Sequence, residues 1–228
     1  MRFLFFDSSS SNLFLAVRNG ERTCFMQFSG DDKHGSSLAP CIDSIMGQVS
    51  LRPEDLDFIG CGIGPGSLTG VRIGMATAKG LCYPHETPLL PICSLDLVAS
   101  QMAHQERIVI RRARAGYYYW RKYRASHDCK VIPDSEPSFS SVESICSALE
   151  ESDSFLFVDG RFDQDDFPSI EWFLASSPSA DAVLHIIDAA LEDIGPKPFR
   201  EVQPLYLQRS LAEDNWDKRH GNESAKDL

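Results

Sequence analysis

The chain has 228 residues, of which 43% are hydrophobic and 24% are charged, and its formal net charge is −11. Such a chain is long enough for one full hydrophobic core or two small lobes, and its composition is that of a globular protein. The negative charge argues against an extended phosphate-binding surface and favours neutral or basic partners. The seven cysteines form no CxxC pair and no apolar run reaches about 18 residues, so we expect a cytoplasmic protein without disulfides or membrane spans.

The first half of the chain alternates short strands with helices. Asn19-Gly20 supplies the positive φ angles of a tight hairpin turn between two strands. From Ser36 onward, apolar residues recur at helical spacing. The expected elements are strands at 2–7, 12–18, 21–28, 57–63 and 88–93, with helices at 36–49, along the glycine-rich stretch to 82, and at 94–103.

The second half repeats this order. Ser140 and Glu143 form a candidate capping box at the start of one helix, and Ser177 is the expected cap of the last helix. The order β-β-β-α-β-α then occurs twice, which predicts an α/β protein with two mixed sheets, the layout of the duplicated actin-like ATPase (ASKHA, ribonuclease H-like) fold. An unrelated α/β protein whose strands coincide by chance is the alternative. The expected elements are strands at 107–113, 116–124, 129–132 and 154–158, with helices from 140 and at 178–193.

This layout divides the chain into two lobes. We expect an N-terminal lobe at 1–104 that is completed by the C-terminal segment 205–228, and a C-terminal lobe at 105–204.

The stretch from Gly62 to Gly80, GIGPGSLTGVRIGMATAKG, opens like a phosphate loop. It lacks the Lys-Ser/Thr pair of a P-loop and the GxGxxG spacing of a dinucleotide fingerprint. As a helix it is capped by Ser67 or Thr69, and it places small residues at every fourth position, which lets another helix approach closely. This stripe either packs on the chain's own helix or sheet or forms a helical interface with a second chain. The stripe consists of Gly66, Gly70, Gly74 and Ala78.

The turn after the first strand is the expected place for a phosphate loop in an actin-like ATPase. Asp7, Ser8 and Ser9 open this turn, but it has no glycine to bring backbone N–H groups onto a phosphate, so we interpret it as a remnant of a nucleotide loop in which Asp7 caps a serine-rich turn. The six histidines form no HxxxH or HExxH pair and the chain has no GxSxG elbow, so we expect no metal site and no catalytic residue.

The segment from Arg107 to Arg124 is basic and rich in aromatic residues. Alternation along the strand puts Tyr117, Tyr119, Arg121 and Tyr123 on one face and their neighbours on the other. Arginines beside aromatic rings can contact RNA, but they are equally typical of a protein interface or of an edge strand protected by charge. The candidate RNA contacts are Arg111, Arg112, Arg114, Arg121 and Lys122.

Five segments together resemble the TsaB (YeaZ) family, over nearly the whole chain. They are FFDSSSSNLFLAV, HGSSLAPCID, GIGPGSLTGVRIGMATAKGL, PICSLDLVA and QPLYLQR, of which the glycine-rich segment is the most specific. Leu68 stands where the family signature usually has Phe. Arg112 stands where the family usually has Asp, in an Asp-Ala-Arg triplet before Gly-x-x-x-Tyr, so a family role of that acid is in doubt here.

The resemblance implies a non-catalytic scaffold subunit of the machinery that makes N6-threonylcarbamoyladenosine (A37) in tRNA. It implies a TsaD-like catalytic partner, a TsaE-like ATPase and a TsaC-like synthase in the same pathway, a homodimer when the chain is alone, and only indirect contact with tRNA. No cofactor is expected on this subunit alone, with ATP or ADP expected at the partner interface. The alternatives are an active ATP-dependent kinase or ATPase, and a glycoprotease-like peptidase, which the absence of metal-binding histidines disfavours.

Partner contact is expected through the helix at 36–49 and the glycine-rich helix. On this hypothesis Gly74→Leu abolishes partner binding and leaves the monomer folded. The expected interface residues are Leu38, Ile42, Ile45, Met46, Gly66, Thr69, Gly70, Arg72, Gly74, Met75 and Ala78.

Overall fold

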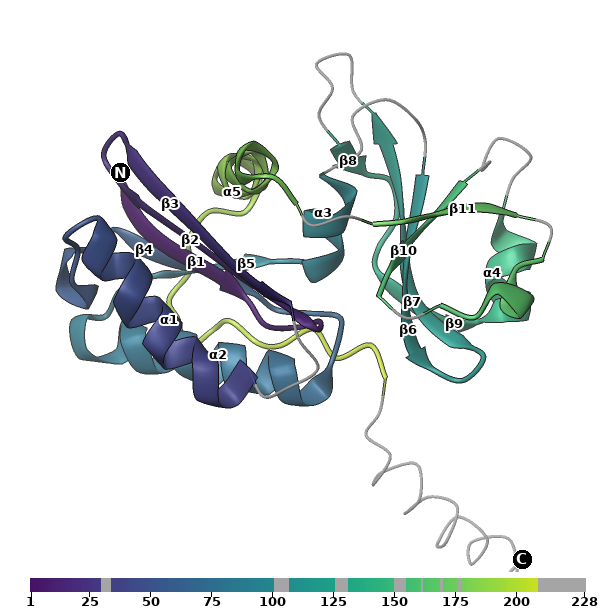
Figure 1. Cartoon of the computed structure of the whole chain (residues 1–228), viewed down its shortest axis with the longest axis horizontal. Coiled ribbons are helices and arrows are strands. Elements are labelled where there is room, and N and C mark those ends of the chain that lie inside the picture. Colours follow the sequence, from purple (N-terminus) through teal and green to yellow (C-terminus); the bar gives the residue numbers. More distant parts are fainter. Residues whose placement is uncertain are drawn as a thin grey trace, which may run out of the picture.

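The computed structural model contains two lobes, each built around a mixed β-sheet (Figure 1). It describes residues 1–29, 34–100, 107–125, 131–149, 155–160, 162–168, 170–175 and 178–208.

The first sheet has five strands in the order β3-β2-β1-β4-β5. β1, β2 and β3 pair antiparallel, and β4 and β5 add in parallel on the other side of β1. Gly20 has a φ of 62° in the turn between β2 and β3, which confirms the hairpin expected from Asn19-Gly20. The strands are β1 (Arg2–Asp7), β2 (Asn12–Asn19), β3 (Arg22–Ser29), β4 (Phe58–Gly62) and β5 (Leu89–Ile92).

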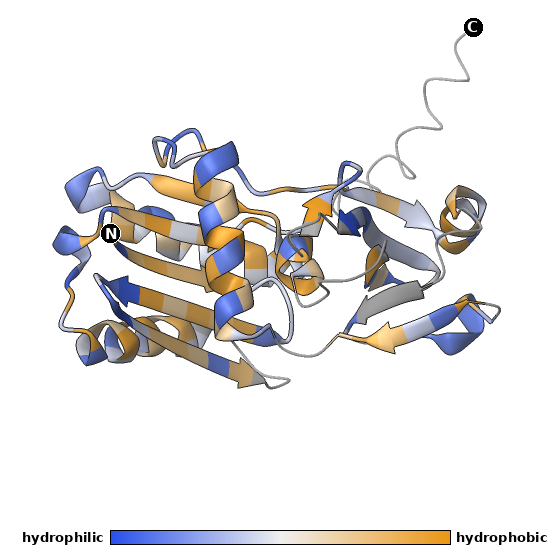
Figure 2. Ribbon diagram, turned by 90° about the horizontal axis from the view of Figure 1, so that it is seen from above, coloured by the Kyte–Doolittle hydropathy of each residue, from blue (hydrophilic) through white to orange (hydrophobic). Residues whose placement is uncertain are grey.

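Helices cover both faces of the first sheet. α1 (His34–Gln48) and α2 (Leu68–Cys82) lie side by side on one face, and α5 (Ala180–Asp193) lies on the other (Figure 1). Val183 and Ile187 of α5 pack on the aromatic side chains of β1. The strands of the first sheet contain many hydrophobic residues (Figure 2), and these pack against apolar residues of the helices. Both faces of β1 are therefore buried, which explains its continuous apolar sequence.

The second sheet has the order β11-β10-β6-β7-β8, with β9 pairing to β7 as well. Read from β8 to β11 and without β9, the strands β8-β7-β6-β10-β11 follow the order β3-β2-β1-β4-β5 of the first sheet. The expected duplication of the actin-like fold is therefore confirmed. Short helices connect the elements of the two lobes: η1 (Pro53–Asp55), η2 (Tyr83–His85), α3 (Ser94–Ala99), α4 (Val142–Ala148) and η3 (Gln164–Asp166). The strands are β6 (Arg107–Arg114), β7 (Tyr117–Ala125), β8 (Val131–Pro133), β9 (Ser138–Ser141), β10 (Phe155–Asp159) and β11 (Glu171–Leu174).

The two faces of β7 have the side chains that alternation predicts. Tyr118 is fully buried on the face covered by α4, together with Ile108 and Ile110 of β6. Tyr123 packs on the opposite face against Leu95 of α3. Because α3 follows β5 directly, it connects the first lobe to the second sheet.

Several expected boundaries differ from the structure. The helix after β9 begins at Val142 with Ser141 as its cap, because Ser140 belongs to β9 and its Oγ accepts a hydrogen bond of 3.0 Å from Trp120 Nε1. The last helix begins at Ala180 and is capped by Ser179. Strands β9 and β11 were not expected, because neither is a long apolar run. The expected cap Ser177, the helix end at 101–103 and the strand start at 129–130 lie outside the described residues.

The chain returns to the first lobe earlier than expected. Besides α5, the segment 195–208 packs there: Lys197 pairs with Leu89, and Leu205 N donates to the carbonyl oxygen of Ile63 at 2.8 Å. Phe199 and Val202 join the core beneath α1 and α2. The expected lobe limit at 204 is therefore displaced to about the start of α5, because an amphipathic pattern shows that a helix is half-buried but not which sheet it covers. Residues 209–228 of the expected C-terminal segment lie outside the described residues.

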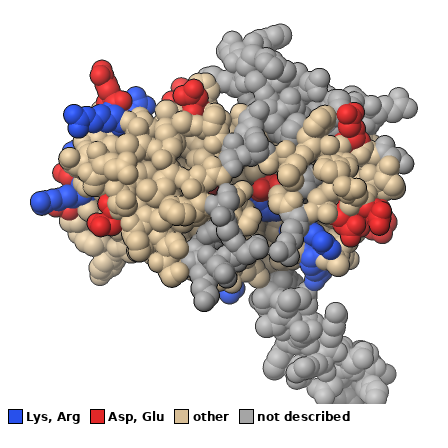
Figure 3. Space-filling view, viewed as in Figure 1, with Lys and Arg blue, Asp and Glu red and all other residues tan. Residues whose placement is uncertain are grey.

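Charged side chains are unevenly distributed. On the face shown in Figure 3, most of the first lobe, including the part over α1 and α2, carries neither basic nor acidic side chains. Within the described residues, no helix is long and apolar enough to cross a membrane.

Candidate functional site

The turn after β1 is the first candidate site, and most of its polar groups are bonded within the chain. Asp7 is 4% exposed, and its Oδ1 accepts a hydrogen bond of 2.6 Å from Ser9 N. Ser8 Oγ donates to the carbonyl oxygen of Gly70 at 2.8 Å, and Ser67 N donates to that of Ser9 at 2.8 Å. The interpretation of Asp7 as the cap of a serine-rich turn agrees with this geometry.

The glycine stripe of α2 faces inward onto the same turn. A Cβ atom on Gly70 would collide with the carbonyl oxygen of Ser8, and one on Gly66 would collide with that of Ser9. A Cβ on Gly74 would lie 2.6 Å from Ser8 Oγ. The stripe thus brings α2 against the chain's own backbone, the internal alternative of the two that the sequence left open. Gly74→Leu would disturb this packing, so it cannot test partner binding in a folded monomer.

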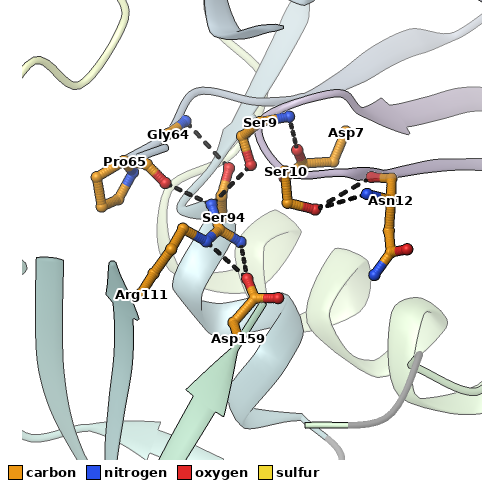
Figure 4. A network of polar contacts seen from close by, with 9 residues as sticks. All are labelled: Asp7, Ser9, Ser10, Asn12, Gly64, Pro65, Ser94, Arg111 and Asp159. Atoms are coloured by element: carbon orange, nitrogen blue, oxygen red, sulfur yellow. Dashed lines mark hydrogen bonds and ion pairs between the residues drawn. The ribbon is translucent and has the colours of Figure 1, made fainter. Parts of the chain in front are cut away.

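Arg111 of β6 joins the two lobes next to this turn (Figure 4). Its Nη1 donates to Ser9 Oγ at 2.9 Å and to the carbonyl oxygen of Pro65 at 2.6 Å, both in the first lobe. Its Nε donates to Asp159 Oδ2 at 2.6 Å, and its Nη2 forms an ion pair with the same oxygen. Asp159 ends β10, so one guanidinium binds groups from three separate segments.

Burial and neighbouring charges shift the pKa of Arg111 in opposite directions. The side chain is 9% exposed and that of Asp159 is 10% exposed. Burial lowers the pKa of Arg111, but the carboxylates of Asp159 and Asp7 outweigh it, so the pKa is raised and the guanidinium stays charged. A buried pair of this kind is costly to break from one side, because the remaining charge is then unpaired.

The space beside Arg111 does not fit the triphosphate of an actin-like ATPase. A small cleft, partly open to solvent, lies between β1, α3, β6 and β10. The Ser9 N–H already donates to Asp7, and the guanidinium of Arg111 fills the gap next to it. Asp7 Oδ2 is buried without a hydrogen-bond partner, and a carboxylate oxygen repels phosphate. The cleft is lined by Asp7, Ser10, Asn12, Phe14, Ser94, Leu97, Val98, Arg111, Asp159 and Pro178.

The expected interface residues divide by burial into two groups. The apolar positions and the stripe belong to the chain's own core, whereas Thr69 and Arg72 are exposed. Arg72 Nε donates to Tyr206 Oη at 3.2 Å, and its guanidinium lies 5.6 Å from the centre of that ring. Contact with a second chain at these positions stays a prediction. The buried positions are Leu38, Ile42, Ile45, Met46, Gly70, Gly74, Met75 and Ala78, and Gly66 is half-buried.

The outer faces of α1 and α2 present a second set of mainly small residues, of which the sequence predicted only Arg72 as an interface residue. A Cβ atom on Gly47 or Gly80 would have no heavy atom within 4 Å. The sequence carries a signal for this set, because these residues recur at helical spacing opposite to the buried ones. We call this set the outer helical face: Ala39, Pro40, Asp43 and Gly47 of α1, and Arg72, Ala76 and Gly80 of α2, all exposed.

The candidate RNA contacts also divide into two groups. Arg111 bonds Asp159, and Arg121 Nη1 lies 2.8 Å from Asp96 Oδ1, so both are used in the junction of the lobes. Arg112 and Arg114 are exposed, and Lys122 is half-buried. The described residues hold no cluster of three or more His, Cys, Asp or Glu side chains suited to a metal ion.

Comparisons with known proteins place these features in a family. A model of the family "tRNA N6-adenosine threonylcarbamoyltransferase" (TsaD) matches residues 29–147, slightly more than half of the chain. The chain is 32% identical over 105 residues to the tRNA threonylcarbamoyladenosine biosynthesis protein TsaB of Bacillus subtilis, a match covering 44% of this chain and 46% of the relative. It is 32% identical over 97 residues to the protein of the same name from Escherichia coli, covering 40% and 42%. The chain thus spans less than half the length of these curated relatives.

A solved structure matches over most of the chain. YeaZ from Pseudomonas aeruginosa superposes with a TM-score of 0.78, covering 90% of this chain and 99% of its own, at 19% identity. At this identity the match shows that the fold is shared.

Proposed function

From its membership of the TsaD family and, within it, of the TsaB (YeaZ) group, we propose a function for the chain. It is a scaffold subunit for the synthesis of tRNA N6-threonylcarbamoyladenosine. It performs no chemistry alone and supports a TsaD-like catalytic subunit. The observation that carries the non-catalytic role is the site of Arg111, where a side chain fills the gap beside the Asp7–Ser9 turn.

The outer helical face is the surface that we propose for the catalytic partner. It is made mainly of small residues on two neighbouring helices, with Asp43 and Arg72 as its charged members. Small exposed residues let a helix of another chain approach closely, and uncharged residues lose little hydration when they are covered. Arg72 and Tyr206 lie at the edge of this face, and both residue types are common among the residues that dominate binding energy.

Further partners follow from the same proposal. A TsaE-like ATPase and a TsaC-like synthase act in the same pathway, and the chain forms a homodimer when it is alone. Any nucleotide of the assembly is bound at the interface with the partner, because the chain's own cleft does not fit a triphosphate. Contact with tRNA is made mainly through the assembly.

Co-expression with a TsaD-like protein tests the proposal. Wild-type chain is expected to co-elute with that protein in size-exclusion chromatography. Ala76→Arg places a long charged side chain on the outer helical face and is expected to abolish co-elution. Ala189→Arg is the matched control, because Ala189 is an exposed alanine in α5, on the opposite side of the first sheet.

The outcomes separate the two parts of the proposal. If the wild-type chain does not co-elute with the TsaD-like protein, the scaffold function is wrong. If Ala76→Arg and Ala189→Arg both co-elute as the wild type does, the function stands and the assignment of the surface is wrong. Circular dichroism of both variants shows whether each is folded.

A further inference from the structure

A short link of four residues, 64–67, connects β4 to α2. Gly64 has a φ of 98° and Gly66 has no side chain, so the backbone of this segment is free to adopt many conformations unless other groups hold it. Ser67 at its end caps α2, since its Oγ accepts a hydrogen bond of 3.2 Å from Gly70 N. The conformation of residues 64–67, which we call the α2 link, therefore decides where α2 begins.

The first lobe holds both ends of the α2 link. At the far end, Ser67 N donates to the carbonyl oxygen of Ser9 at 2.8 Å. At the near end, Ser94 of α3 donates its N–H to the carbonyl oxygen of Gly64 at 2.8 Å, and its Oγ accepts a hydrogen bond of 3.1 Å from Gly64 N. The turn after β1 and the start of α3 thus hold the two ends of the link in place.

The second lobe holds the middle of the α2 link. Arg111 Nη1 donates to the carbonyl oxygen of Pro65 at 2.6 Å, and both residues are buried (Figure 4). A Cβ atom on Gly66 would lie 2.8 Å from the same Nη1 and 2.3 Å from the carbonyl oxygen of Ser9, so the absence of a side chain makes room for the guanidinium. Strand β6 of the second lobe therefore reaches directly to the residues before α2.

The guanidinium is itself fixed in its orientation. Its Nε donates to Asp159 Oδ2 at 2.6 Å on one side, whereas its Nη1 donates to Pro65 and, at 2.9 Å, to Ser9 Oγ on the other. A guanidinium is planar, and its charged N–H groups form stronger hydrogen bonds than neutral donors do. The position of Pro65 is thus tied to that of β10, which ends at Asp159.

α2 extends this position to the outer helical face. The helix has 15 residues, which corresponds to a length of about 22 Å at 1.5 Å per residue. A regular helix moves as a rigid element, so a displacement of its first turn also displaces the exposed residues farther along it. On α2 these are Arg72, Ala76 and Gly80 of the outer helical face.

We propose that Arg111 is a positioning residue for partner binding: through Pro65 it holds α2 where the outer helical face fits the TsaD-like protein. The second lobe thus contributes to the partner surface through the α2 link. The part of this inference that concerns the partner rests on the proposed function. Without the guanidinium, only a fraction of the molecules has α2 in the binding-competent position, and the apparent affinity falls by that fraction.

A double variant separates positioning from stability. Arg111→Met alone leaves Asp159 buried and unpaired, so it loses stability and positioning together. Arg111→Met/Asp159→Leu removes both charges and is expected to recover most of the stability, but the carbonyl oxygen of Pro65 still lacks its charged donor. The double variant therefore shows the effect of the lost contact to the α2 link.

Hydrogen exchange of the full chain, followed by NMR, measures how firmly the link is held. In the double variant the amides of Ser67 and Gly70 are expected to exchange about tenfold faster than in the wild type, the effect of one lost hydrogen bond to a charged donor. The amide of Ala78, in the buried part of α2, is expected to exchange at the wild-type rate.

Titration calorimetry with the TsaD-like protein measures the consequence for binding. The double variant is expected to bind about tenfold more weakly than the wild type. Ile145→Ala is the matched control, because Ile145 is fully buried in the core of the second lobe and its truncation lowers stability without changing Arg111 or the α2 link. This control is expected to keep the wild-type affinity and the wild-type exchange rates at Ser67 and Gly70.

The outcomes decide the proposal at each step. Wild-type exchange at Ser67 and Gly70 in the double variant overturns it, as does an equal increase in Ile145→Ala, which would indicate a general loss of stability. Faster exchange with unchanged affinity also overturns it, because the position of α2 would then have no effect on the partner. If the double variant does not fold, Arg111→Lys replaces it, since an ammonium group keeps the charge but cannot bridge the same acceptors.

Failure of the proposed function can be told apart from failure of this inference. If the wild-type chain does not bind the TsaD-like protein, the scaffold function is wrong, and the claim about the partner is wrong with it. The exchange rates of Ser67 and Gly70 need no partner, so they still decide whether Arg111 holds the start of α2.

Discussion

The two sheets have the same strand order but are stabilised by different interactions. Both faces of β1 in the first sheet pack on apolar helices, α1 and α2 on one side and α5 on the other. The face of the second sheet that meets the first lobe combines a small apolar cluster with the buried ion pair of Arg111 and the partly buried ion pair of Arg121. Apolar packing tolerates small shifts because it has no direction, whereas an ion pair requires one arrangement of its partners. The junction of the lobes is therefore fixed mainly by polar geometry.

The largest effect is expected at the junction. Arg111→Met removes one partner of a buried pair and should lower the free energy of unfolding by about 3–5 kcal/mol, because Asp159 then stays buried without its cation. The double variant Arg111→Met/Asp159→Leu should recover most of this loss, since no unpaired charge is left. Urea unfolding measures both. A loss in Arg111→Met below about 0.5 kcal/mol, the range of ordinary surface changes, would show that the junction does not depend on this pair.

A smaller but clear loss is expected beneath α2. Gly70→Ala brings a Cβ atom against the carbonyl oxygen of Ser8, which belongs to the backbone and cannot move aside cheaply. Overpacking of this kind costs about 1–3 kcal/mol, so the thermal midpoint should fall. An unchanged midpoint would mean that the turn and α2 can separate without cost, contrary to the close packing described above.

Gly80→Ala in the same helix should have the opposite sign. The added Cβ meets no heavy atom within 4 Å, and alanine is favoured over glycine inside a helix by roughly 0.5–1 kcal/mol. The thermal midpoint should therefore rise slightly. A lower thermal midpoint in both Gly70→Ala and Gly80→Ala would indicate that α2 tolerates no substitution at either glycine. The loss of stability in Gly70→Ala would then not be explained by the inward direction of Gly70.

The smallest effect is expected at a surface pair of the first lobe. Arg2 Nη2 lies 2.8 Å from Asp57 Oδ1, and the side chains are 45% and 41% exposed. The hydrogen bond from Arg2 lowers the pKa of Asp57 below its usual 3.8. The pair therefore stabilises the fold above pH 3.8, and this contribution is lost as pH falls through the lowered pKa.

Asp57→Asn should consequently be slightly less stable than the wild type at neutral pH and equal to it in strong acid. Urea midpoints of both proteins from pH 2 to pH 7 measure the difference. If the urea midpoints of the two proteins differ by the same amount at every pH, the charge of Asp57 does not contribute to the difference in stability.

The same contrast explains how much could be predicted from sequence. The antiparallel strands that open each lobe and the course of α2 followed from apolar periodicity and from a cap at Ser67 or Thr69, which are local signals, whereas β9 and β11 of the second sheet were not expected. Contacts between distant segments had no such signal. The sequence marked Arg111 as one basic residue among seven, and only the fold brings it to Ser9, Pro65 and Asp159.

The direction in which a helix faces was the least predictable part of the site. Glycine spacing in α2 indicated a close approach, but the contacting group is the turn after β1 rather than another helix. In the same way, the apolar face of α5 was evident, but its position on the first sheet depends on which apolar surface is left uncovered by the rest of the chain.

The position of α5 also bears on the order in which the protein can fold during synthesis. Phe3 and Phe5 leave the ribosome about 180 residues before Val183 and Ile187, which cover them. Until then one side of the first sheet exposes aromatic side chains to solvent, whereas the second lobe has all of its strands. The first lobe to be made is thus the last to be completed, and in the interval its uncovered sheet is the surface that a chaperone would bind.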